Sequence, residues 1–341
     1  MSGQPMNEEW HIPGSIHTDV YDELKKNNPD ALESVDFDKS IPVVTVCAGG
    51  RTSAVAASLL QKAGYEAFNL TGMKGWSLSW NTASVSFDHY EIIQFRRTGK
   101  GCLSYLIISG GEAMVMDASL PVEVYREYLD KRNLALKFVA DTHIHADHLS
   151  RSKELAECYG IVPSMPANDK LDYSFNPIRG GETLSLGKIG IKAIHTPGHT
   201  LESTSYLVGE KVLLTGDTLF TSGVGRPDLK ANEEEVKHKA SLLYHSLSKL
   251  LKLDKSILVM PGHTSQPIAF DDNPIQVSIG ELLQNVPLLQ REEVVFIQTL
   301  LSRIPATPEN YLTIVEKNSS GDFSNINPVD LEAGANRCAI S

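Results

Sequence analysis

Short apolar runs and glycine loops alternate near the start of the chain. Residues 41–46 form a valine-rich run that leads into the loop Cys47-Ala-Gly-Gly-Arg-Thr-Ser53. Residues 54–63 carry the alanine and leucine content of a helix, which Gly64 closes, and residues 65–70 form a second apolar run. The order of strand, glycine loop, helix and strand predicts a small α/β unit with a parallel sheet.

Farther along the chain the apolar residues alternate in paired strands instead. The sequence predicts three hairpins: residues 103–116 turning at Gly110-Gly111, residues 183–194 turning at Gly187-Lys188, and residues 205–214 turning at Gly209-Glu210. Helical patterns over residues 122–131 and 152–159 lie between them. Because hairpins and helices are mixed, a two-sheet sandwich covered by helices is the simplest architecture.

Two stretches lack such a pattern. Residues 81–88 are polar and show no regular spacing of apolar residues, which is typical of a linker. We therefore place a boundary near Ser86, between domains of residues 1–86 and 87–341. Residues 305–341 are polar and loop-like, and the sequence assigns them no chemistry.

Composition narrows the class of protein. The formal net charge of -11 repels the phosphates of nucleic acid. No stretch of about eighteen apolar residues could span a bilayer, and no secretory signal opens the sequence, so we expect a cytoplasmic enzyme without a membrane partner. A monomer and a homo-oligomer both fit the sequence. The four cysteines lack CxxC spacing, which predicts free thiols: Cys47, Cys102, Cys158 and Cys338.

Histidines and aspartates gather at the ends of four predicted strands. One strand runs into His143-Ile-His145-Ala-Asp147-His148, and three later strands end at His199, Asp217 and His263, each beside glycine or proline. A polar loop that caps the following helix would explain the first of these segments, but not the other three. Imidazole and carboxylate groups are protein ligands for zinc, iron and manganese, so four matched strand ends predict one metal centre.

These residues, at these spacings, resemble the metallo-β-lactamase superfamily over roughly residues 88–272. The resemblance implies an αββα sandwich with the metal at the edge between the sheets. His143, His199 and Asp217 would form a facial triad for one ferrous ion. Four further residues would serve a second zinc site or support the first, with Asp147 also assigned to catalysis: His145, Asp147, His148 and His263. Fe(II) and Zn(II) both remain open on ligand count.

The segment after Asp217 favours iron. Gly-Val-Gly-Arg226-Pro-Asp228 resembles the Gly-x-Gly-Arg-x-Asp motif of persulfide dioxygenases, whereas glyoxalase II enzymes continue with Gly-Arg-x-Phe-Glu. The resemblance implies that Arg226 binds a carboxylate of the substrate thiol. The alternative is a loop arginine paired with Asp228. Proline at position 227 and Pro-Gly-His263-Thr depart from the dioxygenase pattern, which leaves the thiol carrier open.

The first glycine loop has the features of a thiolate site. Backbone N–H groups and a helix start can lower the pKa of Cys47. With His11-Ile-Pro-Gly upstream and Gly-Met-Lys-Gly-Trp76 downstream, the loop resembles a rhodanese domain whose cysteine carries sulfane sulfur. A buried structural cysteine is the alternative. The resemblance makes Cys47 catalytic, and four loop residues would bind the sulfur donor: Gly49, Gly50, Arg51 and Ser53.

Two features depart from the rhodanese pattern. The usual first strand is missing, and Thr52 stands where many rhodaneses have arginine. The resemblances together imply a shortened rhodanese-like parallel α/β domain before a metallo-β-lactamase sandwich. We expect an iron-dependent dioxygenase that converts a small thiol persulfide, such as glutathione persulfide, to sulfite, with thiosulfate as a further sulfur donor. The alternatives are a zinc or mixed-metal thioester hydrolase of glyoxalase II type, and a rhodanese-like part that only packs on the metal domain.

Overall fold

The computed structural model describes residues 12, 14–264, 266, 268–308, 310–332 and 336–340; His11 of the rhodanese-like pattern lies outside them. The N-terminal domain forms as predicted, with β1 paired in parallel to β2. Its helix α2 begins three residues earlier than expected, after Gly50, whose φ of 79° turns the chain into the helix. The elements of this domain are α1 (Tyr21–Lys25), β1 (Val43–Thr45), α2 (Arg51–Lys62), β2 (Ala67–Asn69) and α3 (Met73–Ser77).

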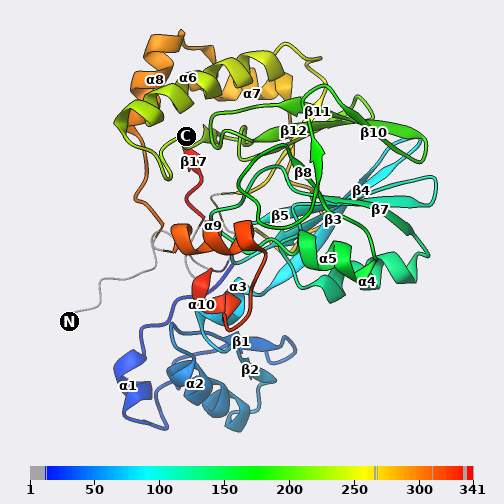
Figure 1. Ribbon diagram of the computed structural model, residues 1–341. Helices are drawn as coiled ribbons and strands as arrows, with labels where there is room; N and C mark the ends of the chain where they lie inside the picture. The colour runs from blue at the N-terminus through cyan, green and yellow to red at the C-terminus, as the bar shows by residue number, and fades with distance from the viewer. Residues whose placement is uncertain are drawn as a thin grey trace.

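The larger domain is a sandwich of two sheets (Figure 1). One sheet has seven strands in the order β3-β4-β5-β6-β7-β8-β9, and the other has six in the order β10-β11-β12-β13-β15-β16. The first sheet contains β3 (Trp80–Ser86), β4 (Glu91–Arg97), β5 (Leu103–Ser109), β6 (Glu112–Met116), β7 (Ala135–Ala140), β8 (Ser164–Pro166) and β9 (Asn176–Ile178). The second contains β10 (Thr183–Leu186), β11 (Ile189–His195), β12 (Thr204–Val208), β13 (Val212–Gly216), β15 (Leu258–Pro261) and β16 (Val277–Ser278).

The core lies between the sheets, and helices cover their outer faces. Ile92 and Leu103 of the first sheet share one buried cluster with Tyr206 and Leu214 of the second. The first sheet carries α4 (Val122–Lys131) and α5 (Ser152–Cys158). The second carries α6 (Glu233–Leu250), α7 (Ile279–Asn285) and α8 (Glu293–Ser302), and a short 3-10 helix spans Pro287–Gln290. The three predicted hairpins and the αββα sandwich are therefore confirmed.

The predicted linker at residues 81–88 is wrong. Residues Trp80 to Ser86 form the edge strand β3, which pairs with β4 along its whole length. An edge strand exposes one side and so carries polar residues, which hid the strand pattern. The larger domain therefore starts ahead of Ser86.

The prediction that residues 305–341 are loop-like is also wrong. This segment forms α9 (Tyr311–Ser320), α10 (Pro328–Leu331) and β17 (Ala339–Ile340), and β17 pairs with β14 (Val224–Gly225) beside the predicted Arg226 motif. In Figure 1 the segment crosses the front of the sandwich, with α10 next to α3 of the N-terminal domain. We call residues 310–332 and 336–340 the C-terminal strap.

Candidate metal centre

The predicted ligands meet at one edge of the sandwich because β7, β11, β13 and β15 all end there. Glycines permit the close approach of these ends. A Cβ on Gly216 would lie 2.3 Å from Oγ1 of Thr142, and a Cβ on Gly262 would lie 2.8 Å from Oδ1 of Asp217. An antiparallel β-bridge between the backbones of Cys102 and His263 joins the two sheets at the same edge. Side chains in place of Gly216 and Gly262 would force the ligand loops apart.

His143, His199 and Asp217 form the first group. Their ligand atoms lie within 4.8 Å of one another, and all three residues are buried. Oδ2 of Asp217 lies 3.8 Å from Nε2 of His143 and 3.6 Å from Nε2 of His199. Atoms about 2.1 Å from one tetrahedral ion lie roughly 3.4 Å apart, so this spacing suits a shared cation.

The chemistry of these atoms also fits a metal. Among the described residues, Nε2 of His143 and Oδ2 of Asp217 are buried and have no hydrogen-bond partner, which is costly without an ion. His199 donates Nδ1–H to the carbonyl of Arg226 at 2.8 Å, which leaves the lone pair of Nε2 free. Burial lowers the pKa of both histidines. Burial raises the pKa of Asp217, but its contacts with His263, His143 and His199 together outweigh burial and lower that pKa. Two neutral imidazoles and one carboxylate result.

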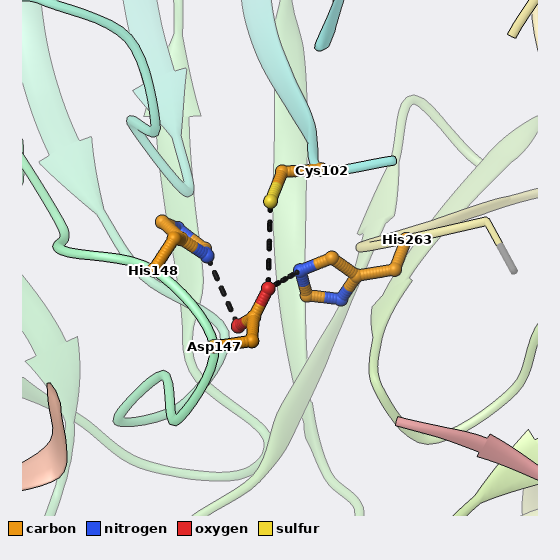
Figure 2. A group of neighbouring side chains, drawn as sticks. All are labelled: Cys102, Asp147, His148 and His263. Carbon is orange, nitrogen blue, oxygen red and sulfur yellow. Dashed lines mark hydrogen bonds and ion pairs between the residues drawn. The ribbon is translucent and has the colours of Figure 1, made fainter. Parts of the chain in front are cut away.

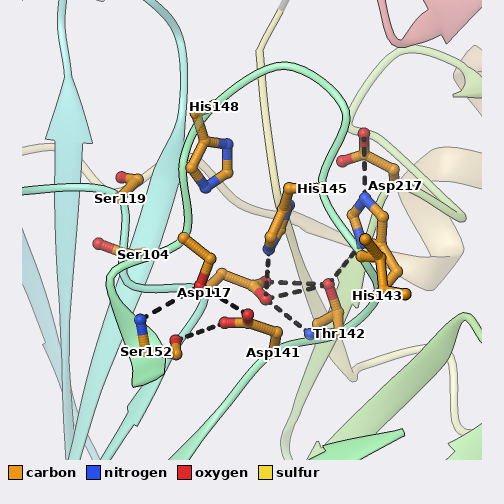
Figure 3. A network of polar contacts seen from close by, with 12 residues as sticks. Ser104, Asp117, Ser119, Asp141, Thr142, His143, His145, His148, Ser152 and Asp217 are labelled. Carbon is orange, nitrogen blue, oxygen red and sulfur yellow. Dashed lines mark hydrogen bonds and ion pairs between the residues drawn. The ribbon is translucent and has the colours of Figure 1, made fainter. Parts of the chain in front are cut away.

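Buried carboxylates orient the loop that carries the first ligands (Figure 3). Oδ1 of Asp117 accepts the N–H of Thr142 at 2.6 Å and lies 3.1 Å from Nε2 of His145. Asp141 accepts the hydroxyls of Ser150 and Ser152 at 2.6 and 2.5 Å. His145 belongs to this carboxylate group and not to the first group, although its ring centroid lies 4.3 Å from that of His143.

Asp147, His148 and His263 form the other predicted group, and the structure adds Cys102 to it (Figure 2). All four side chains are buried. Asp147 accepts from Nδ1 of His148 at 3.1 Å and lies 2.7 Å from Nε2 of His263. His263 also contacts Oδ1 of Asp217 through Nδ1 at 2.5 Å, so it links the two groups.

The sequence missed the C-terminal strap as part of this centre. Asn318 donates to the carbonyls of His145 and His148 at 2.9 and 2.8 Å, and its Oδ1 accepts from the N–H of Ser150 at 2.9 Å. Nδ2 of Asn336 donates to Oδ2 of Asp147 at 2.8 Å. The strap therefore holds the loop that carries four of the predicted ligands.

Glu332 connects the strap to the N-terminal domain. Its carboxylate accepts the N–H of Leu149 at 2.8 Å and pairs with Arg97 at 2.8 Å, and both charged side chains are buried. Nη2 of Arg97 also donates to the carbonyl of Ser77, at the end of α3, at 3.4 Å. A continuous set of contacts thus runs from α3 to the ligand loop.

Arg226 is fully buried, and all five of its N–H donors are used within the chain. Nε and Nη2 form a bidentate pair with Asp228 at 2.8 and 2.7 Å. The remaining donors reach the carbonyls of Pro305, Ala306 and Arg337 at 3.0 to 3.2 Å. This arrangement favours the alternative of a structural arginine over the predicted contact with a substrate carboxylate.

Cys47 lies between the end of β1 and the start of α2. Its sulfur accepts from the N–H of Gly50 at 3.1 Å and of Ser53 at 3.4 Å, and lies 3.2 Å from Oγ of Ser53. Burial raises the pKa of Cys47, but hydrogen bonds from Ser53, Thr52 and Gly50 outweigh it and lower the value to about 7. Gly50 and Ser53 therefore act as expected of a thiolate site, whereas the hydrogen bonds described for the Cys47 sulfur do not involve Gly49 or Arg51.

Comparison with known families agrees with this geometry. The family described as Metallo-beta-lactamase superfamily matches residues 97–263, and Rhodanese-like domain matches residues 5–79. The chain therefore has a rhodanese-like α/β fold followed by an αββα sandwich of the metallo-β-lactamase fold. No described helix is long and apolar enough to cross a membrane.

Individual relatives fall into two groups. A hydroxyacylglutathione hydrolase from Francisella tularensis subsp. novicida is 32% identical over 47% of this chain and 61% of its own length, and one from Brucella ovis is 33% identical over 40% and 51%. The chain thus spans about half to three fifths of these curated relatives. Among solved structures, a metallo-beta-lactamase from Staphylococcus aureus is 27% identical with a TM-score of 0.62, covering 71% of this chain and 74% of its own. ETHE1 from Myxococcus xanthus is 27% identical with a TM-score of 0.59, covering 67% and 97%.

Proposed function

We propose that this protein is an iron-dependent persulfide dioxygenase that oxidises the sulfane sulfur of a small thiol persulfide to sulfite. The observation that carries the proposal is the group of His143, His199 and Asp217, two neutral imidazoles and one carboxylate whose ligand atoms lie within 4.8 Å of one another. Nε2 of His143 and Oδ2 of Asp217 are buried there without a hydrogen-bond partner. Such a set leaves open positions for a substrate and dioxygen on a ferrous ion. The likeness to ETHE1, which is of the persulfide dioxygenase type, supports the same activity.

The reaction is R–S–SH + O₂ + H₂O → R–SH + SO₃²⁻ + 2H⁺. The S–S bond breaks, the sulfane sulfur loses four electrons to dioxygen, and the thiol leaves with a proton. A ferrous ion at the centre would hold the persulfide sulfur and dioxygen side by side. The protein contributes orientation: His199 is fixed by the carbonyl of Arg226, and Thr142 lies 2.9 Å from Nδ1 of His143.

The N-terminal domain supplies the persulfide in this proposal. The Cys47 thiolate attacks the outer sulfur of thiosulfate, sulfite leaves, and the resulting Cys47 persulfide passes its outer sulfur to the small thiol. The N–H groups of Gly50 and Ser53 would stabilise the anionic sulfur in both forms. The proposal thus joins both domains in one use of sulfane sulfur.

A thioester hydrolase of glyoxalase II type is the second candidate. The names of the curated relatives favour it, since those relatives are hydroxyacylglutathione hydrolases. All residues for a second ion, Asp147, His148 and His263, are present as well. In that case zinc or mixed metals would activate a water molecule against a thioester.

Oxygen consumption separates the two. Protein purified without air should consume dioxygen and release sulfite with glutathione persulfide, and should contain one iron per chain. His199→Ala should abolish this consumption, whereas Cys47→Ser should retain it because the persulfide is supplied directly. Hydrolysis of S-lactoylglutathione without oxygen consumption would refute the dioxygenase proposal and support the hydrolase.

A further inference from the structure

Lys239 is a buried cation that the proposed reaction does not yet use. It lies on α6, and only 8% of its surface is exposed. Within the part of the chain that the structure describes, its ammonium group forms no ion pair and donates to one carbonyl, that of Leu229, at 3.2 Å. An ammonium group has three N–H donors, so two of them lack a partner among these residues. Burying such a charge is costly unless an anion compensates it.

Helix α6 places Lys239 beside a ligand of the metal centre. The helix packs against the loop that leads to His199, since a Cβ on Gly198 would lie 2.5 Å from Cα of Leu243. Lys239 lies one turn before Leu243 on this helix. Burial lowers the pKa of His199, and the positive charge of Lys239 lowers it further. The ammonium group is therefore close to the edge of the sandwich where the ligands meet.

A second cation, Lys170, approaches the same place through the buried Glu202. Oε2 of Glu202 pairs with Nζ of Lys170 at 2.7 Å, and its Oε1 accepts the N–H of Ile144 at 3.4 Å. Ile144 follows the predicted ligand His143, so this ion pair contacts the metal-ligand loop. The Lys170 side chain is 47% exposed, which gives the two lysines a side that faces solvent.

The charges around Lys239 do not balance. Asp228 is already paired with Arg226, and Glu202 is paired with Lys170, so the charge of Lys239 remains in excess. Because Arg226 uses all its donors within the chain, it has none left for a substrate. Lys239 is thus available for the contact that the sequence predicted for Arg226.

The pKa of Lys239 agrees with this count. Burial lowers this pKa to about 8, although Glu202 and Asp228 act to raise it. Glu235 also acts to raise it, but that side chain is exposed in the first turn of α6, where water and salt screen its charge. The carboxylates of the chain therefore do not compensate the buried ammonium group, and a further anion beside it would be stabilised.

We propose that Lys239, assisted by Lys170, binds an anionic group of the thiol that carries the persulfide, in place of Arg226. The group is a carboxylate or a phosphate, since both accept charge-assisted hydrogen bonds from an ammonium group. Lys239 is then a specificity-determining residue that selects anionic thiol persulfides over uncharged ones. This proposal deepens the proposed function and rests on it for the persulfide chemistry, whereas binding of the anionic carrier is measured without turnover.

Calorimetric titration of the full chain, loaded with Zn²⁺, tests this binding with probes that cannot react. S-methylglutathione carries carboxylates, and S-methyl coenzyme A carries phosphates, so the pair distinguishes the two anions. The unaltered protein should bind at least one probe, and Lys239→Met should weaken that binding by about 10- to 100-fold, the loss expected for a charge-assisted hydrogen bond. Lys170→Met should cause a smaller loss, because Lys170 is already paired with Glu202. Lys239→Arg keeps the charge and should retain most of the affinity.

Lys237→Met is the matched control. Lys237 lies on the same helix, but its side chain is exposed and pairs with Glu233 at 2.8 Å, so this variant should bind the probe as the unaltered protein does. The melting temperature separates binding from a structural role. Lys239→Met should keep or raise it, because the substitution removes an uncompensated buried charge. A lower melting temperature with unchanged affinity would make Lys239 structural and overturn the proposal.

Equal affinity of the unaltered protein and Lys239→Met for both probes would also overturn it, as would no binding of either probe. If Lys239→Met does not fold by circular dichroism, Lys239→Gln decides. Oxygen consumption with glutathione persulfide tests the proposed function separately. Probe binding that depends on Lys239, without oxygen consumption, would leave this proposal standing, and oxygen consumption with an unchanged KM in Lys239→Met would leave only the function.

Discussion

Replacing Asn318 by alanine should loosen the metal-ligand loop from a distance. The substitution removes three buried hydrogen bonds, two to the carbonyls of His145 and His148 and one from the N–H of Ser150. At about 1 kcal/mol each, their loss should lower the free energy of unfolding by roughly 3 kcal/mol. Because the loop carries His143, affinity for the first ion should also fall, by about 10- to 100-fold.

Urea unfolding of the metal-free protein measures the first effect, and competition with a chromophoric chelator measures the second. Asn310→Ala is the control, since it removes one strap hydrogen bond that does not reach the loop, and should lower the free energy of unfolding by only about 1 kcal/mol. The reasoning would fail if Asn318→Ala matched Asn310→Ala in stability and kept full metal affinity.

Three further predictions follow from the site. The rate of Cys47 alkylation, measured by mass spectrometry, should rise with pH and reach half its maximum near pH 7, because the pKa of Cys47 is lowered to about 7 and only the thiolate reacts. Ser53→Ala should move this midpoint to higher pH. A midpoint near pH 9 in the unaltered protein would contradict the assignment. Arg226→Ala removes one partner of a buried ion pair, so it should lower the free energy of unfolding by about 3 to 5 kcal/mol and increase proteolysis of the strap. A change confined to KM would instead favour the predicted contact with a substrate carboxylate. Removing the metal with a chelator should lower the melting temperature, because a metal in 100-fold excess over its Kd stabilises the folded state by about 2.7 kcal/mol. In His199→Ala, the melting temperature should be the same with and without metal. The same result in the unaltered protein would argue against the metal centre.

The sequence predicted what local patterns encode. The four strand ends carry their ligands within a few residues of an apolar run, and the Cys47 loop holds its thiolate through contacts no more than 6 residues away. The hairpins likewise depend on short turns. These features need no knowledge of distant segments, which is why the sandwich and both candidate sites could be proposed before the fold was known.

Contacts between distant segments could not be predicted in this way. Asn318 reaches His145 across 173 residues, and Asn336 reaches Asp147 across 189. Neither asparagine belongs to a recognisable local motif. Cys102 follows Gly101, but no motif around it indicates that it belongs to a site. Arg226 makes contacts of both kinds. The sequence predicted its ion pair with nearby Asp228 as one alternative, but it did not predict the distant carbonyl partners at Pro305 and Ala306.

The long separation between the strap and the ligand loop bears on the order of folding. Asn318 contacts the ligand loop across more than 160 residues, and the entropy of closing such a loop is lost before its contacts form, so we expect the strap to dock after the ligand loop has folded. Asp147 therefore spends the earlier part of folding without its amide partner. A metal ion present during folding would then meet the carboxylate of Asp147 before Asn336 has reached it.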